Sequence, residues 1–431
     1  MIRLHASAPD FPAAFASLVD SRRESSADLS RDVAAMVARV RAEGAAAVRD
    51  LTLRLDRHDL NETGWRVPLE DCAAAYAALE PGLRHALDLA AARIRAYHER
   101  QRPADTDYRD EAGVRLGARW RPVDAAGLYV PGGRAAYPSS LLMNAIPAKV
   151  AGVRRLAMVT PTPGGRINPL VLAAAHLAGV DEVWRIGGAQ AVAALAYGAG
   201  DLLPVDVVTG PGNAWVAEAK RQLYGVVGID MVAGPSEIVV VADADNDPDW
   251  IAADLLSQAE HDVTTQSILF TDDAAFADRV AEAVDRQLAT LATEAVARAA
   301  WDANGAIVVT DALPDALPLV DRLAPEHLQL AVADPEPLFA RVRHAGSVFL
   351  GRHTPEAIGD YVAGPNHVLP TGRRARFASG LSVLDFMKRT SFLGLDETAL
   401  AELGPATVAL AEAEGLPAHA RSVALRLRLN R

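Results

Sequence analysis

The strongest constraint on the fold is an alternation of apolar, strand-like runs with helix-length segments from Gly127 to about residue 351. In the first series, a short strand enters the Pro-Gly-Gly turn at 131–133, and strands at 154–161, 181–188 and 205–213 follow, separated by helices. A second series has strands at 237–243, 266–272, 305–311 and 346–351. Strands separated by helices of about ten residues indicate parallel sheets covered by helices. We therefore predict an α/β fold with two serial, Rossmann-like but incomplete parallel-sheet domains.

The segments around these two series are mainly helical. Residues 1–30 read as an N-terminal arm, helices are predicted within 30–56 and 71–103, and a strand-like run covers 113–123. Helices from about 396 to the end, with a break at 415–417, have no sheet of their own to cover, so we expect them to pack on a second subunit. The predicted domains are the arm 1–30, a first α/β domain 31–126 plus 237–378, a second α/β domain 127–236, and a C-terminal dimerisation extension 379–431.

Composition narrows the class of protein. The 431 residues carry a formal charge of −12, which argues against nucleic acid as a partner because phosphate binding needs a basic patch. Cys72 is the only cysteine, so no internal disulfide can form and a reducing cytoplasm is the expected location. No apolar run reaches the length of a membrane span, and the N-terminus lacks the apolar core of a signal peptide.

Side chains suited to metal binding and proton transfer gather in four segments. Gln258 and His261 are three residues apart at the end of a helix predicted from Pro248, so one helix face would present an amide oxygen and an imidazole nitrogen. Zinc accepts that pair of ligands. The other segments are 324–330 with Glu326 and His327, 354–371 with Asp360, Asn366 and His367, and 411–420 with Glu414 and His419.

Each of these segments also has a purely structural interpretation. Gln258 and His261 could form a polar helix end, and the Glu326–His327 pair could be solvated in a loop. Asp360 could be an exposed helix residue, and His367 could stabilise a proline-rich turn. His419 could lie on the surface of the last helix. Residue types alone leave these alternatives open.

Several long motifs make the chain resemble the histidinol dehydrogenases. They are YVPGGRAAYPSSLLMNAIPAKVAGV, VTGPGNAWVAEAKRQLYGVVGIDMVAGPSE, DLLSQAEHD, APEHL, AGSVFLG, AGPNHVLPT and SGLSVLDFMK. The resemblance runs from about residue 30 to 425. It implies an NAD-dependent, zinc-dependent four-electron oxidation of L-histidinol to L-histidine through L-histidinaldehyde, the last two steps of histidine biosynthesis.

The resemblance also implies a set of site residues. One zinc per subunit would be held by Gln258, His261, Asp360 and His419, the last from the neighbouring subunit, so the active form would be a homodimer with shared sites. Glu326 and His327 would be the acid/base pair. Substrate contacts would be Ser236, Gln258, His261, His327, Asp360, His367, Glu414 and His419, and NAD contacts would be Tyr129, Gln190 and Asn213.

The chemistry of the reaction agrees with these roles. Histidinol carries an imidazole and an amine that can both ligate a metal, which leaves the hydride-donor carbon free. An imidazole is suited to taking the alcohol proton, so His327 is the candidate base. A carboxylate beside it, Glu326, can activate the water that adds to the aldehyde. Two hydrides leave, so two NAD are consumed.

One expected feature is missing, because no GxGxxG follows any strand. The glycine-rich turns at 131–133, 187–188 and 210–213 would have to bind the dinucleotide instead. Three rival functions remain open: a related zinc/NAD dehydrogenase of another small polar alcohol, a zinc hydrolase that uses Glu326 as base without NAD, and a silent binding protein. The intact Glu326 and His327 argue against the last.

Overall fold

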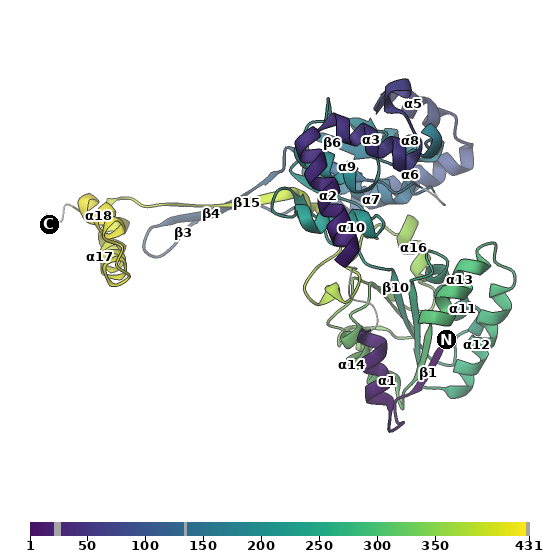
Figure 1. Ribbon diagram of the computed structural model, residues 1–431. Helices are drawn as coiled ribbons and strands as arrows, with labels where there is room; N and C mark the ends of the chain where they lie inside the picture. The colour runs from purple at the N-terminus through teal and green to yellow at the C-terminus, as the bar shows by residue number, and fades with distance from the viewer. Residues whose placement is uncertain (21–26, 133–135, 428–431) are drawn as a thin grey trace. The chain divides into compact units, whose positions relative to one another are not determined.

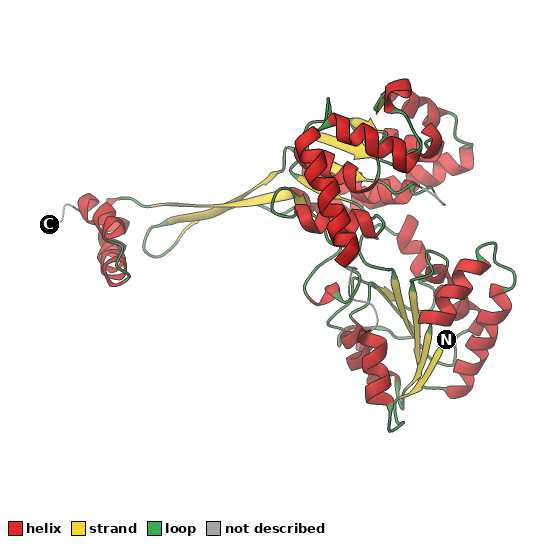
Figure 2. Ribbon diagram, in the orientation of Figure 1, coloured by secondary structure: helices red, strands yellow, loops and turns green. Residues whose placement is uncertain are grey.

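The computed structural model describes residues 1–20, 27–132 and 136–427, and the chain divides into two compact units. The first unit comprises Met1–Gln101 and Val123–Phe386, and the second comprises Arg102–Pro122 and Met387–Arg431. The first unit contains two six-stranded sheets, each with helices packed against it (Figure 1; Figure 2). We call them, with their helices, the β10 lobe and the β5 lobe. The predicted α/β class with parallel sheets is confirmed.

The β10 lobe is an entirely parallel sheet in the order β1-β12-β11-β10-β13-β14. Its strands are β1 (Ile2–His5), β10 (Glu237–Ala242), β11 (Gln266–Thr271), β12 (Ala306–Val309), β13 (His327–Ala331) and β14 (Ser347–Leu350). Every residue of β10 is buried, because helices cover both faces of the sheet. This explains why its sequence is an unbroken apolar run after Glu237.

Five helices supply the two covers of this sheet. Residues Val240 and Ala242 pack against α11 (Pro248–Ala259), α12 (Ala274–Leu288) and α13 (Glu294–Asn304). Val239 and Val241 point the other way, toward α1 (Phe11–Asp20) and α14 (Leu313–Leu323). The alternation along one strand thus divides the lobe's core into two layers. Short α15 (Glu336–Phe339) lies between β13 and β14, and α16 (Glu356–Tyr361) follows β14.

The β5 lobe has the strand order β2-β7-β6-β5-β8-β9, parallel except for β2. Its strands are β2 (Arg66–Val67), β5 (Ala125–Tyr129), β6 (Arg155–Val159), β7 (Glu182–Trp184), β8 (Val207–Thr209) and β9 (Gly228–Ile229). Its helices are α2 (Ala27–Glu43), α3 (Ala45–Asp56), α4 (Leu60–Thr63), α5 (Leu69–Ala77), α6 (Pro81–Glu99), α7 (Pro138–Ala151), α8 (Pro169–Ala178), α9 (Gly188–Tyr197) and α10 (Ala214–Leu223).

The structure differs from the predicted grouping of 31–126 with 237–378. Strand β2 pairs with β7, and α2 and α3 bury Val40, Val48 and Leu51 in the core of the β5 lobe. These helices group with the β5 lobe because one face of its sheet must be covered, and α2 and α3 carry apolar stripes that cover it. The N-terminal segment also differs from a separate arm, since β1 is the edge strand of the β10 sheet and α1 packs on that sheet.

A loop after α16 ties the two lobes together. Asn366 Nδ2 donates to the carbonyl of Met143 in α7 at 2.6 Å, and Arg93 of α6 donates to the carbonyls of Val362 and Ala363. This loop carries His367. Among its described residues, the unit also has short 3-10 turns at Pro163–Gly165, Arg374–Arg376 and Val383–Phe386.

The second unit is an antiparallel ribbon in the order β15-β4-β3 together with two helices. Its elements are β3 (Thr106–Arg109), β4 (Arg115–Pro122), β15 (Met387–Gly394), α17 (Glu397–Ala413) and α18 (Pro417–Arg426). The predicted break between the last helices is confirmed, and Gly415 there has φ +71°. Helices α17 and α18 pack on each other. Across the described ranges, no helix combines the length and apolar character that a membrane crossing requires.

Candidate active site

Most of the predicted acid/base and metal residues lie at the amino-terminal edge of the β10 sheet. Strand β13 begins at His327, Glu326 precedes it, and Ser236 precedes β10. Helix α11 follows β10 and runs back along the sheet, so Gln258 in its last turn returns to the same edge. Ligands of parallel sheets usually bind at the carboxyl ends of strands. In this lobe the polar cluster is at the opposite edge.

The His327 ring is held in one orientation by the main chain. Its Nδ1 lies 3.0 Å from the carbonyl oxygen of Glu237, an acceptor, so Nδ1 carries the hydrogen. Nε2 is buried and makes no hydrogen bond with any residue that the structure describes. Because Nδ1 donates to the main chain, Nε2 is the nitrogen that can act as a general base.

Glu326 is fixed on the same strand junction. Its Oε2 accepts the N–H of Glu237 at 2.9 Å and lies 3.6 Å from His327 Nδ1. Burial raises the pKa of Glu326 to about 8, while the neighbouring imidazole opposes that rise. Burial by itself lowers the pKa of His327, but the carboxyls of Glu326 and Glu356 outweigh it and the pKa is raised. Glu326 can thus exchange a proton near neutral pH.

Asp360 and His367 form a second pair beside this one. His367 Nδ1 donates to the main-chain oxygen of Asp360 at 3.0 Å and lies 3.4 Å from its carboxylate. On its other side, Nε2 is 3.3 Å from the hydroxyl of Ser140 in α7. The pKa of Asp360 is lowered: burial opposes this, and the hydrogen bond with His367 prevails. The carboxylate is therefore ionised, as a metal ligand must be.

Gln258 has the environment expected of a ligand. Its side chain is fully buried, and neither amide atom reaches hydrogen-bond geometry with the residues the structure describes, although the amide lies close enough to Glu356 to lower that residue's pKa. A buried amide without partners is costly unless something unseen satisfies it. His261 does not share a helix face with Gln258 as expected, because α11 ends at Ala259. His261 lies exposed in the following turn, where its main-chain N–H donates to the carbonyl of Gln258. The helix cannot extend there because the chain turns toward β11.

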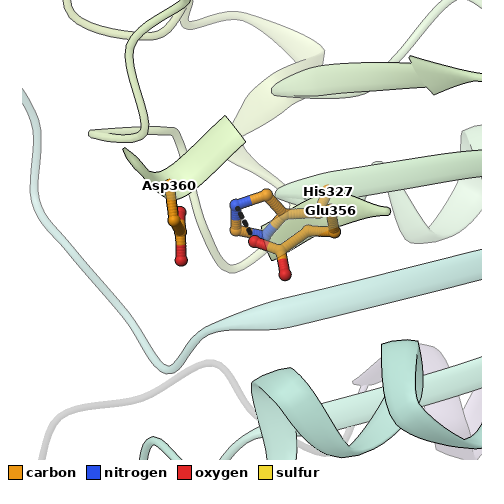
Figure 3. A group of neighbouring side chains, drawn as sticks. All are labelled: His327, Glu356 and Asp360. Atoms are coloured by element: carbon orange, nitrogen blue, oxygen red, sulfur yellow. Dashed lines mark ion pairs between the residues drawn. The ribbon is translucent and has the colours of Figure 1, made fainter. Parts of the chain in front are cut away.

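Sequence reasoning missed Glu356. Figure 3 shows it beside His327 and Asp360, and potential ligand atoms of these three residues lie within 4.8 Å of one another. Glu356 and Asp360 are four residues apart on α16 and so share a face. Nothing in the run Thr-Pro-Glu distinguishes this glutamate from an exposed helix start, so only the fold identifies it.

The predicted dinucleotide residues lie at the carboxyl ends of the β5 sheet, where a ligand is usual. Tyr129 ends β5, and its hydroxyl accepts the N–H of Gly188, the first residue of α9. Burial raises the pKa of Tyr129 to about 12. Gln190 in α9 is buried, and both of its amide atoms lack partners within the described part of the chain. The chain adds β6 and β7 on one side of β5 and then β8 and β9 on the other, so the gap between β5 and β8 is the switch point where doubly wound sheets bind nucleotides.

The GPGN turn at 210–213 follows β8 at that switch point. Gly210 has φ +111°, and a Cβ there would lie 2.1 Å from the carbonyl oxygen of Tyr129, so only glycine fits. Asn213 is exposed and caps α10 by accepting the N–H groups of Trp215 and Val216. Of the other predicted turns, 187–188 begins α9, whereas Gly133 of 131–133 lies outside the described residues.

Comparisons with known proteins agree with this arrangement. A family model described as histidinol dehydrogenase matches residues 19–427. A histidinol dehydrogenase of Zymomonas mobilis is 64% identical over 99% of this chain and 99% of its own length. The histidinol dehydrogenase of Rhodospirillum rubrum is 63% identical over 99% of this chain and 98% of its own length. The crystal structure of histidinol dehydrogenase from Elizabethkingia anophelis superposes with a TM-score of 0.93 at 34% identity, covering 99% of this chain and 98% of that one.

The chain belongs to the histidinol dehydrogenase family. It is accordingly an oxidoreductase of histidine biosynthesis that acts on histidinol. The predicted resemblance and function are confirmed. Glu326 and His327 are 6% and 4% exposed, so they are not a solvated pair in a loop.

The last two predicted residues belong to the second unit. Glu414 is the C-cap of α17, and His419 lies in the first turn of α18. Both are exposed. Their predicted roles as substrate contact and metal ligand are taken up below as proposals.

Proposed function

We propose that this chain oxidises L-histidinol to L-histidine in two NAD-dependent steps through L-histidinaldehyde, with one zinc per subunit. The observation that carries the proposal is the His327–Glu326 pair. One buried imidazole has its Nδ1 bound to the main chain and its Nε2 bare, and a buried carboxyl group adjoins it. A base and an activator of water are what two successive oxidations of an alcohol need.

In the first step His327 takes the alcohol proton at Nε2. The hydrogen bond from Nδ1 to the carbonyl of Glu237 fixes the ring, so the lone pair of Nε2 stays directed into the site. The hydride leaves to NAD⁺, which supplies the electron acceptor for both steps. In the second step Glu326 removes a proton from the water that adds to the aldehyde. Because its Oε2 is anchored on the N–H of Glu237, the carboxyl group is held beside the imidazole.

The proposed zinc ligands are Gln258, His261 and Asp360 with His419 of the partner subunit. The buried, unpartnered amide of Gln258 and the ionised Asp360 fit a divalent cation. When bound, zinc would orient the imidazole and amine of the substrate and favour the alkoxide form of its hydroxyl. Further substrate contacts are proposed for Ser236, His327, His367 and Glu414.

The proposed NAD contacts are Tyr129, Gln190 and Asn213. Their support is their position at the carboxyl ends of the β5 sheet around its switch point, and the unpartnered amide of Gln190. Since no GxGxxG is present, the backbone of the glycine turns at 187–188 and 210–213 would have to approach the cofactor.

A homodimer is proposed because the second unit exposes apolar side chains. Leu410 of α17 is 66% exposed and Leu425 of α18 is 64% exposed. A second copy of the chain could cover them and receive His419 and Glu414. A cytoplasmic location remains a prediction from the single cysteine.

The test is NADH formation from L-histidinol before and after a zinc chelator. We expect two NADH per histidinol, loss of activity on chelation and recovery with added zinc. Hydrolysis of an ester or amide without NAD would favour a hydrolase instead. Faster turnover of another polar alcohol would favour a related dehydrogenase.

A further inference from the structure

Glu356 is the nearest carboxylate to the nitrogen of His327 that takes the proton, and the proposed function gives it no role. Its Oε1 lies 3.5 Å from His327 Nε2, and its side chain is 1% exposed (Figure 3). Burying a carboxylate this completely is costly unless a charged partner compensates for the lost hydration. Burial raises the pKa of Glu356, and the neighbouring imidazole of His327 opposes that rise and favours the charged carboxylate.

The carboxylate of Glu356 is itself held from a second side. Its Oε2 lies 3.2 Å from the hydroxyl of Ser257 in α11, whose one hydrogen is shared with the carbonyl of Asp254 at 2.8 Å. Its Oε1 lies 3.5 Å from Nε2 of His327. The amide of Gln258 is close enough to the Glu356 carboxyl to lower its pKa as well.

His327 is therefore placed between two acceptors on opposite sides. The carbonyl of Glu237 receives Nδ1–H, and Glu356 faces Nε2. When the alcohol proton moves to Nε2, the O–H bond breaks, an N–H bond forms, and the hydride leaves to NAD⁺. The ring then carries a positive charge 3.5 Å from the Glu356 carboxylate.

We propose that Glu356 is a positioning residue for the oxidation. Its carboxylate stabilises, by its charge, the imidazolium that forms when the proton is transferred to Nε2. The inference rests on the proposed function of His327 as base. A carboxylate likewise stabilises the protonated histidine of serine proteases, although there it binds the other nitrogen.

A competing role is ligation of a metal together with Asp360, since both carboxylates and His327 lie within 4.8 Å. The two roles differ in what depends on Glu356. A positioning residue changes the chemical step and leaves the metal bound. A ligand changes the metal content first.

The experiment compares Glu356→Gln and Glu356→Asp with a matched control, Glu218→Gln. Glu218 is another buried glutamate, 2% exposed in its side chain, and pairs with Arg221 on α10 of the β5 lobe. Each purified enzyme is assayed for kcat and KM with L-histidinol, for zinc content after dialysis, and for the solvent deuterium isotope effect on the first hydride transfer.

For Glu356→Gln we expect kcat to fall by about 10²-fold, within the range that general-base catalysis contributes. KM for histidinol should change by less than about threefold, zinc should stay at one per chain, and the isotope effect should grow because proton transfer becomes slower. Glu356→Asp keeps the charge and should recover at least half of the lost kcat on a logarithmic scale. Glu218→Gln should keep kcat and the isotope effect unchanged even if its melting temperature falls.

Three results would overturn the inference. An unchanged kcat in Glu356→Gln would show that the ring needs no carboxylate. Loss of zinc in either Glu356 variant would make the residue a ligand. An activity loss that follows the melting temperature, as in the control, would make the role structural. If Glu356→Gln does not fold, the Asp variant decides between these outcomes. Absence of NADH formation by the wild-type enzyme would instead refute the proposed function.

Discussion

The orientation of one imidazole determines which atom of this protein can take a proton. The carbonyl of Glu237 binds Nδ1 of His327, and the same residue's N–H binds Glu326. A single peptide segment at the start of β10 thus fixes both members of the acid/base pair. Main-chain groups in a parallel ladder move little, so the pair is preorganised without side-chain rearrangement.

We expect Glu326→Gln to slow aldehyde oxidation much more than alcohol oxidation, because only the second step needs an activated water. Glutamine can still accept the N–H of Glu237, so the fold should be retained. The loss in the second step should be roughly 10²–10⁴-fold. NADH formation from histidinol and from histidinaldehyde, measured separately, checks this. An equal fall in both half-reactions would contradict the division of roles.

The raised pKa of Glu326 predicts a pH dependence of the second step. A group with a pKa of about 8 is mostly protonated at pH 7 and becomes a base as the pH rises through that value. Aldehyde oxidation should therefore increase between about pH 7 and 9 and then level off. The residual activity of Glu326→Gln should lack this rise. A wild-type profile that is flat in this range would rule out Glu326 as the titrating base.

Among the elements, α10 and the turn before it show how a buried ion pair can hold a loop. Lys220 and Asp230 are 2% and 1% exposed in their side chains and pair with each other. Lys220 Nζ also donates to the carbonyl of Gly210 at 3.0 Å, and Asp230 accepts the N–H of Gly210 at 2.8 Å. The pair therefore binds both the carbonyl and the N–H of Gly210, the residue that begins the GPGN turn.

Lys220→Met should leave the Asp230 charge buried and unpaired, which costs about 3–5 kcal/mol. The double variant Lys220→Met/Asp230→Asn removes that charge and should recover part of the loss. Urea unfolding followed by tryptophan fluorescence compares the two midpoints. If the double variant unfolds as early as the single one, an unpaired charge is not the cause of the instability.

At the scale of the whole molecule, the proposed site needs residues from both units of the fold. Gln258, Asp360 and the acid/base pair belong to the first unit, whereas Glu414 and His419 belong to the second. In the proposed dimer the second unit of one chain completes the site of the other. This arrangement makes activity depend on association.

Two inactive variants should therefore complement each other. His419→Asn and Glu326→Gln chains would each be poorly active alone, but a hybrid dimer contains one site with both wild-type residues and one with both lesions. After exchange of an equal mixture, about half of the dimers are hybrids, so activity should approach about a quarter of wild type. A tagged subunit verifies exchange. Exchange without recovered activity would show that His419 acts within its own chain or is not a ligand.

Local sequence determined those features that depend on neighbouring residues. The strand-helix alternation predicted the parallel sheets, because apolar runs such as β10 must be buried on both faces and each crossover needs a helix. The break at Gly415 was predicted because the run Gly-Leu-Pro ends one helix and begins the next. The long motifs identified the family, and with it the candidate residues.

Tertiary structure decided the features that depend on contacts distant in sequence. Strand β15 (residues 387–394) pairs with β4 (residues 115–122), which is more than 260 positions away in the chain. Its polar sequence alone does not indicate a strand. Helices α2 and α3 could cover either sheet by their periodicity, and the shape of the β5 core chose between them. Glu356 has no local signal at all. The environment of a buried charge is made by the groups that the fold places around it. For Glu356 that group is the imidazole of His327, which lies 3.5 Å away and 29 positions earlier in the chain.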